Sequence, residues 1–279
     1  MSDALSAGTA SGKSRARASR FAERSAAILG DIWPPVVVLV ALLGFWEWAC
    51  MAFAVKPYVL PAPSAIWEAA TSGFGQLMYN AGITAWEALA GFVIGSAMGA
   101  VIGTAFAYSR FMARGFMPLL IAANTIPTVA IAPIIIIWFG HGIGSKIAVT
   151  AFLSFFPLAL NMMKGLQSYD RVVADVFRIS AASPAQTFFK MRLPTAMPYV
   201  FVGLKLNVTF SVIGAIVAEF IQADRGLGFV IMTTYRTMAM PKLWAAMILS
   251  ALLGIVFFLI VAALERLFVP WHASMEPGR

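Results

Sequence analysis

The chain has 279 residues, of which 61% are hydrophobic and only 11% are charged, and its mean hydropathy is +0.84. Soluble domains carry about 25% charged residues, so this composition indicates an integral membrane protein. One cysteine and two well-separated histidines exclude a disulfide framework and a His/Cys metal cluster. The net charge of +8 could indicate a nucleic-acid partner. The distribution of the basic residues instead follows the pattern of a membrane protein, in which they gather on the cytoplasmic side.

The first residues form a basic segment rich in serine and alanine, without sustained apolar periodicity. We predict that residues 1–28 are a disordered cytoplasmic tail and that residues 29–279 form one transmembrane domain. A mitochondrial transit peptide, also rich in arginine and serine, is the competing interpretation. A basic tail before a first span also sets the orientation of that span, which favours an uncleaved anchor.

Six apolar stretches each approach the roughly 20 residues that a membrane-spanning helix needs. They cover residues 36–55, 83–108, 116–138, 147–163, 199–221 and 244–268. Six spans put both termini on one side, and that side holds most of the basic residues. The positive-inside rule makes it cytoplasmic. The sequence therefore predicts an all-α, multi-pass membrane protein with both termini in the cytoplasm.

The second span carries Gly91, Gly95, Gly99 and Gly103, each four residues from the next. Glycines at this spacing lie on one helix face and allow another helix to approach closely. The partner helix is either in the same subunit or in a second copy, and the sequence leaves both open.

Several polar residues fall inside or beside the predicted spans. The candidates for a translocation path are Asn124, Thr125, Thr128, Asn161 and Glu219. Each can instead bond a neighbouring helix. Acids within a span, such as Glu47 and Glu87, need a partner or a cavity, and a structural pair is the alternative to a substrate contact.

Residues 167–198 form a charged, well-punctuated segment between two spans, which we call the two-helix loop. A first helix has one stripe made of Val172, Val173, Val176, Phe177 and Ser180, and we expect this helix to end near residues 181–182. Ser183 and Gln186 form a capping box that starts a second helix. We expect Pro194 to end that helix.

The two-helix loop resembles the "EAA" coupling loop of ABC importer permeases, which contacts a separate ATPase. The matching positions are Asp175, Arg178, Ala182, Ser183, Leu193, Pro194, Ala196 and Pro198. This chain departs from the pattern at the Ala-Ala pair, which is Val176 and Phe177, and at the glycine, which is Ala181. That glycine serves a positive-φ turn, which alanine enters at a cost of roughly 1–2 kcal/mol. The resemblance implies ATPase-coupling roles for Asp175, Phe177, Arg178, Ala181, Ser183, Phe188 and Pro194.

Further matches to the same family extend from about Lys56 to the end of the chain. They include Leu60 to Ser64, the Trp-Phe-Gly-x-Gly-x-x-Ser-Lys stretch ending at Lys146, and Ala218-Glu219 followed by Gly226-Leu227-Gly228. They are similar to the nitrate, sulfonate and taurine type, a subgroup that also includes permeases for pyrimidine vitamin precursors and riboflavin. The ending around Glu265 looks somewhat more like the vitamin-precursor branch.

The resemblance implies a type I ABC importer permease fold in the bacterial inner membrane. Such a subunit imports a small solute as a homodimer, with an ATPase dimer inside and a substrate-binding protein outside. The chain has no nucleotide-binding, metal-binding or catalytic motif, so we expect no enzyme activity and no cofactor here, with ATP on the ATPase. A stand-alone secondary transporter driven by an ion gradient is the alternative.

Overall fold

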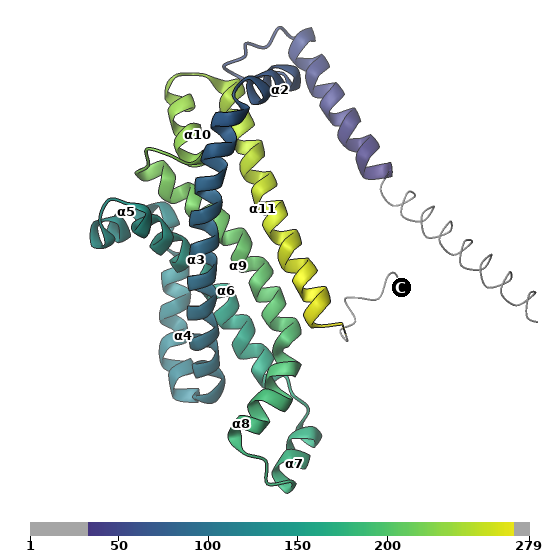
Figure 1. Ribbon diagram of the computed structural model, residues 1–279, viewed down its shortest axis with the longest axis vertical. Helices are drawn as coiled ribbons and strands as arrows, with labels where there is room; N and C mark the ends of the chain where they lie inside the picture. Colours follow the sequence, from purple (N-terminus) through teal and green to yellow (C-terminus); the bar gives the residue numbers. More distant parts are fainter. Residues whose placement is uncertain (1–32, 271–279) are drawn as a thin grey trace, which may run out of the picture. The chain divides into compact units, whose positions relative to one another are not determined.

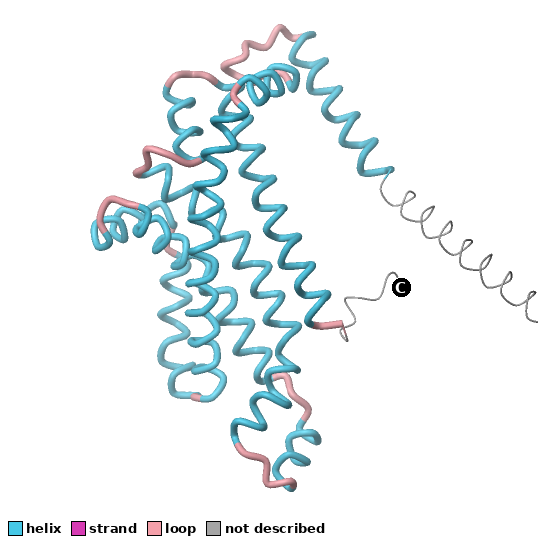
Figure 2. Tube along the Cα trace, viewed as in Figure 1, coloured by secondary structure: helices cyan, strands magenta, loops and turns pink. Residues whose placement is uncertain are grey.

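The computed structural model describes residues 33–270, in which every regular element is a helix (Figure 2). Five helices are long and apolar enough to cross a membrane, or six if a bent pair counts as one span. The predicted all-α membrane fold is therefore confirmed. The predicted tail, residues 1–28, lies outside the described residues. The chain divides between Ala65 and Ile66 into two compact units, and each is described by itself.

The first unit contains the helix Trp33–Ala52, close to the first predicted span. Glu47, on this helix, holds the start of the next helix, α2 (Pro63–Ser72). Its carboxylate accepts hydrogen bonds from the Ser64 backbone N–H at 3.0 Å and from the Ser64 hydroxyl at 2.7 Å. A carboxylate is stabilised at a helix N-terminus, where backbone N–H groups lack partners. Glu47 therefore makes a structural contact, which was the alternative to a contact with substrate.

The second unit is built around α6 (Ile143–Gln167), which packs between α3 (Phe74–Tyr108) and α9 (Leu193–Ile221) (Figure 1). All four glycines of the repeated motif are buried and face α6. A Cβ at any of them would overlap atoms of α6. The glycine face therefore serves packing within one chain, which decides between the two partners that the sequence left open.

Asn207 of α9 joins the same three helices through its amide group. Its carbonyl oxygen accepts a hydrogen bond from the Leu158 N–H, and its NH2 group donates to the Ser96 hydroxyl, both at 3.1 Å. All three residues are buried. An amide buried among apolar helices needs such partners, so Asn207 is a structural link between α3, α6 and α9.

The third predicted span is not one straight helix, and this prediction is corrected. Helices α4 (Arg110–Thr125) and α5 (Thr128–Phe139) meet at an angle of 103°. Ile126 and Pro127 between them are extended, with ψ angles of 128° and 130°. The proline ring disfavours the helical region for the residue before it, which is consistent with the break at Ile126.

The fourth span is longer than predicted, because α6 has 25 residues instead of the 17 between Ile147 and Met163. The remaining helices of the second unit are α10 (Leu227–Arg236) and α11 (Met240–Phe268). An ion pair between Lys205 and Glu265 joins α9 to α11.

The two-helix loop contains α7 (Arg171–Ile179) and α8 (Pro184–Thr187). The prediction that Pro194 ends the second helix is wrong, since the chain stays helical from Pro184 to Ile221. A π-helical turn, η1 (Phe188–Arg192), connects α8 to α9. Within this wider turn the Leu193 N–H bonds to the Phe188 carbonyl, five residues earlier. The changed hydrogen-bond register accommodates a proline that has no N–H of its own.

Candidate functional site

The two-helix loop is shaped by local hydrogen bonds at three points. At the start of α7, the Asp170 side chain accepts a bond of 2.8 Å from the Val172 N–H. At its end, the N–H groups of Ala181 and Ala182 bond to the carbonyls of Arg178 and Phe177, both at 3.0 Å. This pair of bonds is a Schellman motif. It places Ala181 at a φ of +50°, so the positive-φ turn expected for the family's glycine is present with alanine in its place.

The capping box at α8 is confirmed. The Ser183 N–H donates to the Gln186 side chain at 2.8 Å, and the Gln186 N–H donates to the Ser183 hydroxyl at 3.2 Å. Reciprocal bonds of this kind satisfy two backbone donors that a helix start leaves open. The entry to α8 is therefore fixed by residues within the loop itself.

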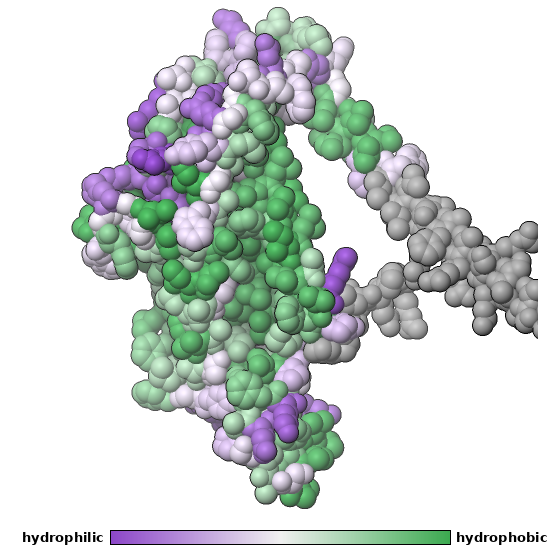
Figure 3. Space-filling model, viewed as in Figure 1, coloured by the Kyte–Doolittle hydropathy of each residue, from purple (hydrophilic) through white to green (hydrophobic). Residues whose placement is uncertain are grey.

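One face of α7 is apolar, and no element within residues 33–270 covers it. Val172, Val176 and Ile179 lie one turn apart, and their exposed fractions are 71%, 56% and 86%. Val173 beside them is 43% exposed. We call these four residues the apolar stripe. In Figure 3 the tip of the loop shows hydrophobic side chains beside hydrophilic ones. An apolar face of this kind marks a surface that contacts a partner or a membrane.

The two phenylalanines after α8 point in different directions. Phe188 is half-buried against the cluster of Met162, Leu166 and Ala196, and its ring centroid lies 6.4 Å from that of Tyr108. Phe189 is 65% exposed. The structure thus places Phe189, which the sequence analysis did not select, at the surface of the loop, and Phe188 against the core of the unit.

The charged residues of α7 remain open to solvent. Asp175 and Arg178 form an ion pair at 3.4 Å, with side chains 63% and 84% exposed. Phe177 is half-buried beside them. Exposed pairs contribute little to stability, so both side chains are available to other charges.

Arg192 ties the loop to the end of α3, and the sequence analysis did not identify this role. Its guanidinium lies 4.7 Å from the ring centroids of both Tyr108 and Tyr169. Tyr108 ends α3, while Tyr169 precedes α7. Two cation–π contacts therefore link the loop to a long helix of the unit.

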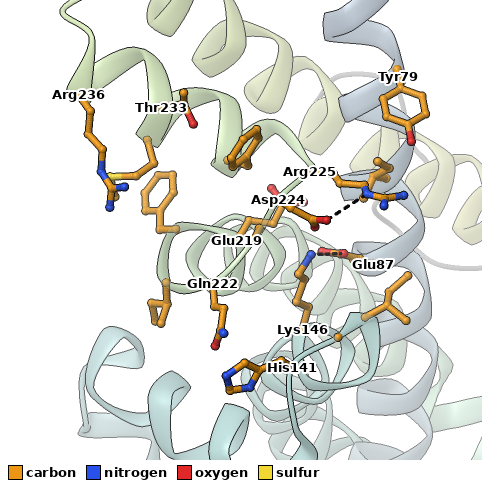
Figure 4. A pocket seen from close by; sticks show the side chains of 18 residues that line it. Tyr79, Glu87, His141, Lys146, Glu219, Gln222, Asp224, Arg225, Thr233 and Arg236 are labelled. Atoms are coloured by element: carbon orange, nitrogen blue, oxygen red, sulfur yellow. Dashed lines mark hydrogen bonds and ion pairs between the residues drawn. The ribbon is translucent and has the colours of Figure 1, made fainter.

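At the far end of α3 and α9 from the loop lies a pocket of about 790 Å³, which we call the charged pocket (Figure 4). Residues of α3, α6, α9 and α10 line it. Its ionisable side chains are Glu87, His141, Lys146, Glu219, Asp224, Arg225 and Arg236, together with Tyr79. The volume falls within the range of small-molecule sites.

A buried ion pair forms one wall of the charged pocket. Lys146 Nζ lies 3.1 Å from Glu87 Oε1, and the two side chains are only 9% and 1% exposed. Figure 4 shows them pointing toward each other from α6 and α3. A charge held this far from water requires a counter-ion, so each residue explains the burial of the other.

Glu219, one of the predicted path residues, lines the charged pocket and also fastens a loop to α3. Its carboxylate accepts hydrogen bonds from the Thr84 hydroxyl at 2.7 Å and from the Gly228 N–H at 2.6 Å. The Leu227 N–H donates to Thr84, and the Gly226 N–H donates to Asn80. The loop around Gly226 is therefore held at the pocket by buried polar groups.

Asp224 and Arg225 form the rim of the pocket and pair at 3.4 Å. Bonding to its own backbone N–H, assisted by the Arg225 guanidinium, holds the pKa of the Asp224 carboxyl below its ordinary value. This carboxyl is therefore ionised at neutral pH and remains a counter-ion for Arg225.

The other predicted path residues lie apart from the charged pocket. Asn124 and Thr128 line a narrow hollow beside α6. The Thr125 hydroxyl bonds to the Ala122 carbonyl at 2.7 Å, and the Asn161 amide bonds to the Pro157 carbonyl at 2.8 Å. Of the five candidates, the structure brings only Glu219 to the charged pocket, and a role in transport stays a prediction for all of them. Among residues 33–270, no three His, Cys, Asp or Glu side chains gather to hold a metal ion.

Comparison with known proteins gives one family and several relatives. The family described as binding-protein-dependent transport system inner membrane component matches residues 91–271. The formylaminopyrimidine transport permease protein of Halalkalibacterium halodurans is 33% identical over 85% of this chain and 95% of its own length. The riboflavin transport system permease protein of Chloroflexus aurantiacus is 31% identical over 87% and 92%. A putative aliphatic sulfonates transport permease protein of Bacillus subtilis is 30% identical over 88% of each chain.

Proposed function

This chain belongs to the family of inner membrane components of binding-protein-dependent transport systems, the permease subunits of ABC importers, and we propose how it couples to its partners. Two copies form the membrane path, a separate ATPase dimer binds the two-helix loops, and an external binding protein delivers the solute. Both termini lie in the cytoplasm. The named substrates of the relatives make sulfonate-like anions, pyrimidine precursors and riboflavin-type compounds the candidate solutes.

The observation that carries this proposal is the exposed apolar stripe on a preformed loop. Capping bonds at Asp170, Ser183 and Ala181 fix the loop without any partner. A short amphipathic helix with its apolar face uncovered suits a groove on another protein. Asp175 and Arg178 lie off the stripe, where they meet charges at the edge of such a groove.

The charged pocket then lies on the external side, at the opposite end of α9 from the loop. There it is the first part of the second unit that a delivered solute meets. Closure of the ATPase pair moves the two-helix loop, and the helices carry that movement to the pocket. Alternating access between the two sides follows from this arrangement.

Co-purification of the ATPase with the permease, beside ATP-driven uptake into right-side-out vesicles that are loaded with ATP and supplied with the binding protein, tests the proposal. Ile179→Asp places a charge on the apolar stripe and should remove both ATPase binding and uptake, while the permease still inserts. Phe111→Asp is the matched control, because Phe111 is 81% exposed but lies on α4, outside the loop. We expect this control to keep its ATPase.

If the Ile179→Asp variant keeps the ATPase and transports normally, the two-helix loop is not the coupling element. Uptake by the purified chain alone, driven by an ion gradient, would favour the stand-alone secondary transporter instead. The comparisons do not favour that alternative, since the relatives are named as subunits of transport systems.

A further inference from the structure

An open hollow lies at the start of α4, at the same end of the second unit as the two-helix loop (Figure 1). Its volume is about 500 Å³, and it is lined by Arg110, Phe111, Arg114 and Gly115. We call it the arginine hollow. Both arginines are exposed, and Phe111 is 81% exposed. The hollow therefore presents two guanidinium groups and one aromatic ring to its surroundings.

The charges at this helix start are unfavourable on their own. Arg110 is the first residue of α4, where the helix dipole already concentrates positive charge and favours acidic side chains. Arg114 follows four residues later, and like charges at that spacing repel each other. The first turn of α4 contains no acid that would offset them. One anion between the two guanidinium groups would relieve all of these repulsions.

The chain supplies no such anion within residues 33–270. Neither arginine of the hollow forms an ion pair there. The acids at this end of the second unit already have partners, since Asp170 caps α7, while Asp175 and Glu265 form ion pairs of their own. The anion that the arginine hollow suits is therefore expected from a partner molecule.

The same hollow also offers apolar surface. Phe111, Gly115 and Leu119 follow one another at intervals of four residues, so they form a line along α4 beside the two arginines. Leu119 is 62% exposed. A Cβ built on Gly115 meets no neighbouring atom within 4 Å, so this glycine leaves a gap between the two larger side chains. A molecule that carries both a phosphate and a hydrocarbon chain matches this combination.

The arginine hollow lies at the level where lipid headgroups are expected. Tyr108 directly precedes the turn into α4, and its ring centroid lies 6.4 Å from that of Phe188, the first residue of η1. Helices α7 and α8 extend beyond this level (Figure 1). Tyrosine is enriched at the membrane–water interface, and arginine on its cytoplasmic side. In the proposed orientation, basic side chains at this surface meet anionic lipids.

We propose that the arginine hollow binds the phosphate of an anionic phospholipid, phosphatidylglycerol, from the cytoplasmic leaflet. Arg110 and Arg114 bind the phosphate oxygens, which the forked donors of arginine match. An acyl chain packs against Phe111 and fills the gap at Gly115. This inference goes beyond the proposed function and rests on it only for the choice of leaflet.

Lipid titration of the purified permease–ATPase complex in detergent, followed by native mass spectrometry, tests the proposal. The probes are dioleoyl phosphatidylglycerol, dioleoyl phosphatidylcholine and inorganic phosphate. We expect phosphatidylglycerol to bind with a Kd at least tenfold lower than phosphatidylcholine, and inorganic phosphate not to displace it. Equal binding of the two lipids would overturn the proposal. Displacement by inorganic phosphate would overturn it as well, because the site would then take a soluble anion.

Removal of the two charges locates the bound lipid. The double variant Arg110→Gln with Arg114→Gln should reduce the preference for phosphatidylglycerol to twofold or less. Arg171→Gln with Lys190→Gln is the matched control, because it removes two exposed positive charges from the two-helix loop at the same end of the unit. A preference that survives in the first variant, or that is lost equally in the control, would contradict the assignment to the arginine hollow.

Filling the hollow provides a test without any change of charge. Gly115→Leu should weaken phosphatidylglycerol binding at least fivefold, because the new side chain occupies the place of the acyl chain. Gly82→Leu in α3 is the control, since a Cβ there also meets no neighbouring atom within 4 Å. Leucine favours a helix more than glycine does, so both variants should fold. Unchanged binding by Gly115→Leu would place the lipid elsewhere.

The two proposals fail in different ways. If the complex keeps its ATPase but shows no preference between the lipids, only the inference about the arginine hollow is lost. If the ATPase does not associate, the proposed function is lost, and the lipids are then ranked on the permease alone. Should a variant fail to fold, the ranking of the three probes on the unaltered complex still decides the inference.

Discussion

Each end of the second unit carries an ion pair on or beside its candidate site, and the two pairs lie in opposite surroundings. Lys146 and Glu87 are almost completely buried in the charged pocket, while Arg178 and Asp175 lie open on α7. Figure 3 shows hydrophilic side chains gathered at both ends of this unit, near α10 and near α7, with hydrophobic side chains between. The buried pair is locked by its surroundings, whereas the exposed pair is free to exchange partners.

The same contrast holds for the apolar side chains. At the charged pocket, aromatic groups line a concavity. At the two-helix loop, the apolar stripe and Phe189 are exposed at the surface of the part of the chain that the structure describes. In the proposed function, the concave end receives a small molecule and the exposed helix at the other end binds in a groove of another protein.

Removing one partner from each ion pair should give the largest difference between the two ends. Lys146→Met leaves the buried Glu87 carboxylate unpaired, and we expect a loss of about 3–5 kcal/mol in unfolding free energy. Arg178→Met should cost less than about 0.5 kcal/mol, because water screens that pair. Denaturant unfolding in detergent, followed by tryptophan fluorescence, measures both. The double variant Lys146→Met with Glu87→Gln should recover much of the loss, and similar costs for the two single variants would contradict the contrast.

The adjacent phenylalanines separate binding from packing. Phe189→Ala should reduce affinity for the ATPase by about 2 kcal/mol, roughly thirtyfold, without changing the unfolding midpoint. Phe188→Ala should instead lower the midpoint, because Phe188 packs against Met162, Leu166 and Ala196. Surface binding assays and thermal unfolding on the same preparations distinguish them. The opposite assignment would show that Phe189 is the packed residue of the two.

Arg192 should determine how firmly the loop is held to α3. Arg192→Leu removes two cation–π contacts worth about 0.5–1 kcal/mol each. We expect amide hydrogen exchange in α7 and α8 to become roughly tenfold faster, since local opening then costs less free energy. Arg171→Leu is the control on the same loop, and Arg192→Lys should fall between. Unchanged exchange in Arg192→Leu would show that other contacts hold the loop.

The smallest effect concerns the positive φ of Ala181. Ala181→Gly should stabilise the protein by up to about 1 kcal/mol, because glycine adopts this conformation without strain. Ala185→Gly in α8 should destabilise it by a similar amount, because that position is helical. Thermal unfolding of the two variants provides the comparison. A loss of stability in Ala181→Gly would mean that the turn carries little strain.

Local signals in the sequence predicted local structure well. Ser183 and Gln186 are three residues apart, so their capping box depends on no distant contact. The four glycines of α3 predicted close helix packing, but not that the partner helix is α6. Identifying that partner requires knowledge of which helices are neighbours, and periodicity within one helix does not contain it.

Long-range pairing was what the sequence could not provide. Glu87 and Lys146 belong to different helices, and no local sequence pattern in either helix identifies the other as its neighbour. Arg192 acquires its role only when Tyr108 and Tyr169 are brought together. The prediction from Pro194 was wrong for a different reason, since a proline often ends a helix, whereas here the helix continues through the π-turn η1 into α9.

The uninterrupted course of α9 has a mechanical consequence. Its 29 residues extend about 44 Å at 1.5 Å per residue, from the π-turn at one end to Glu219 near the other. A rigid helix of that length amplifies rotation at its base, since a tilt of about 10° at η1 displaces the far end by roughly 8 Å. A small tilt at the base of α9 would therefore be felt most strongly at Glu219 and at the loop that it holds.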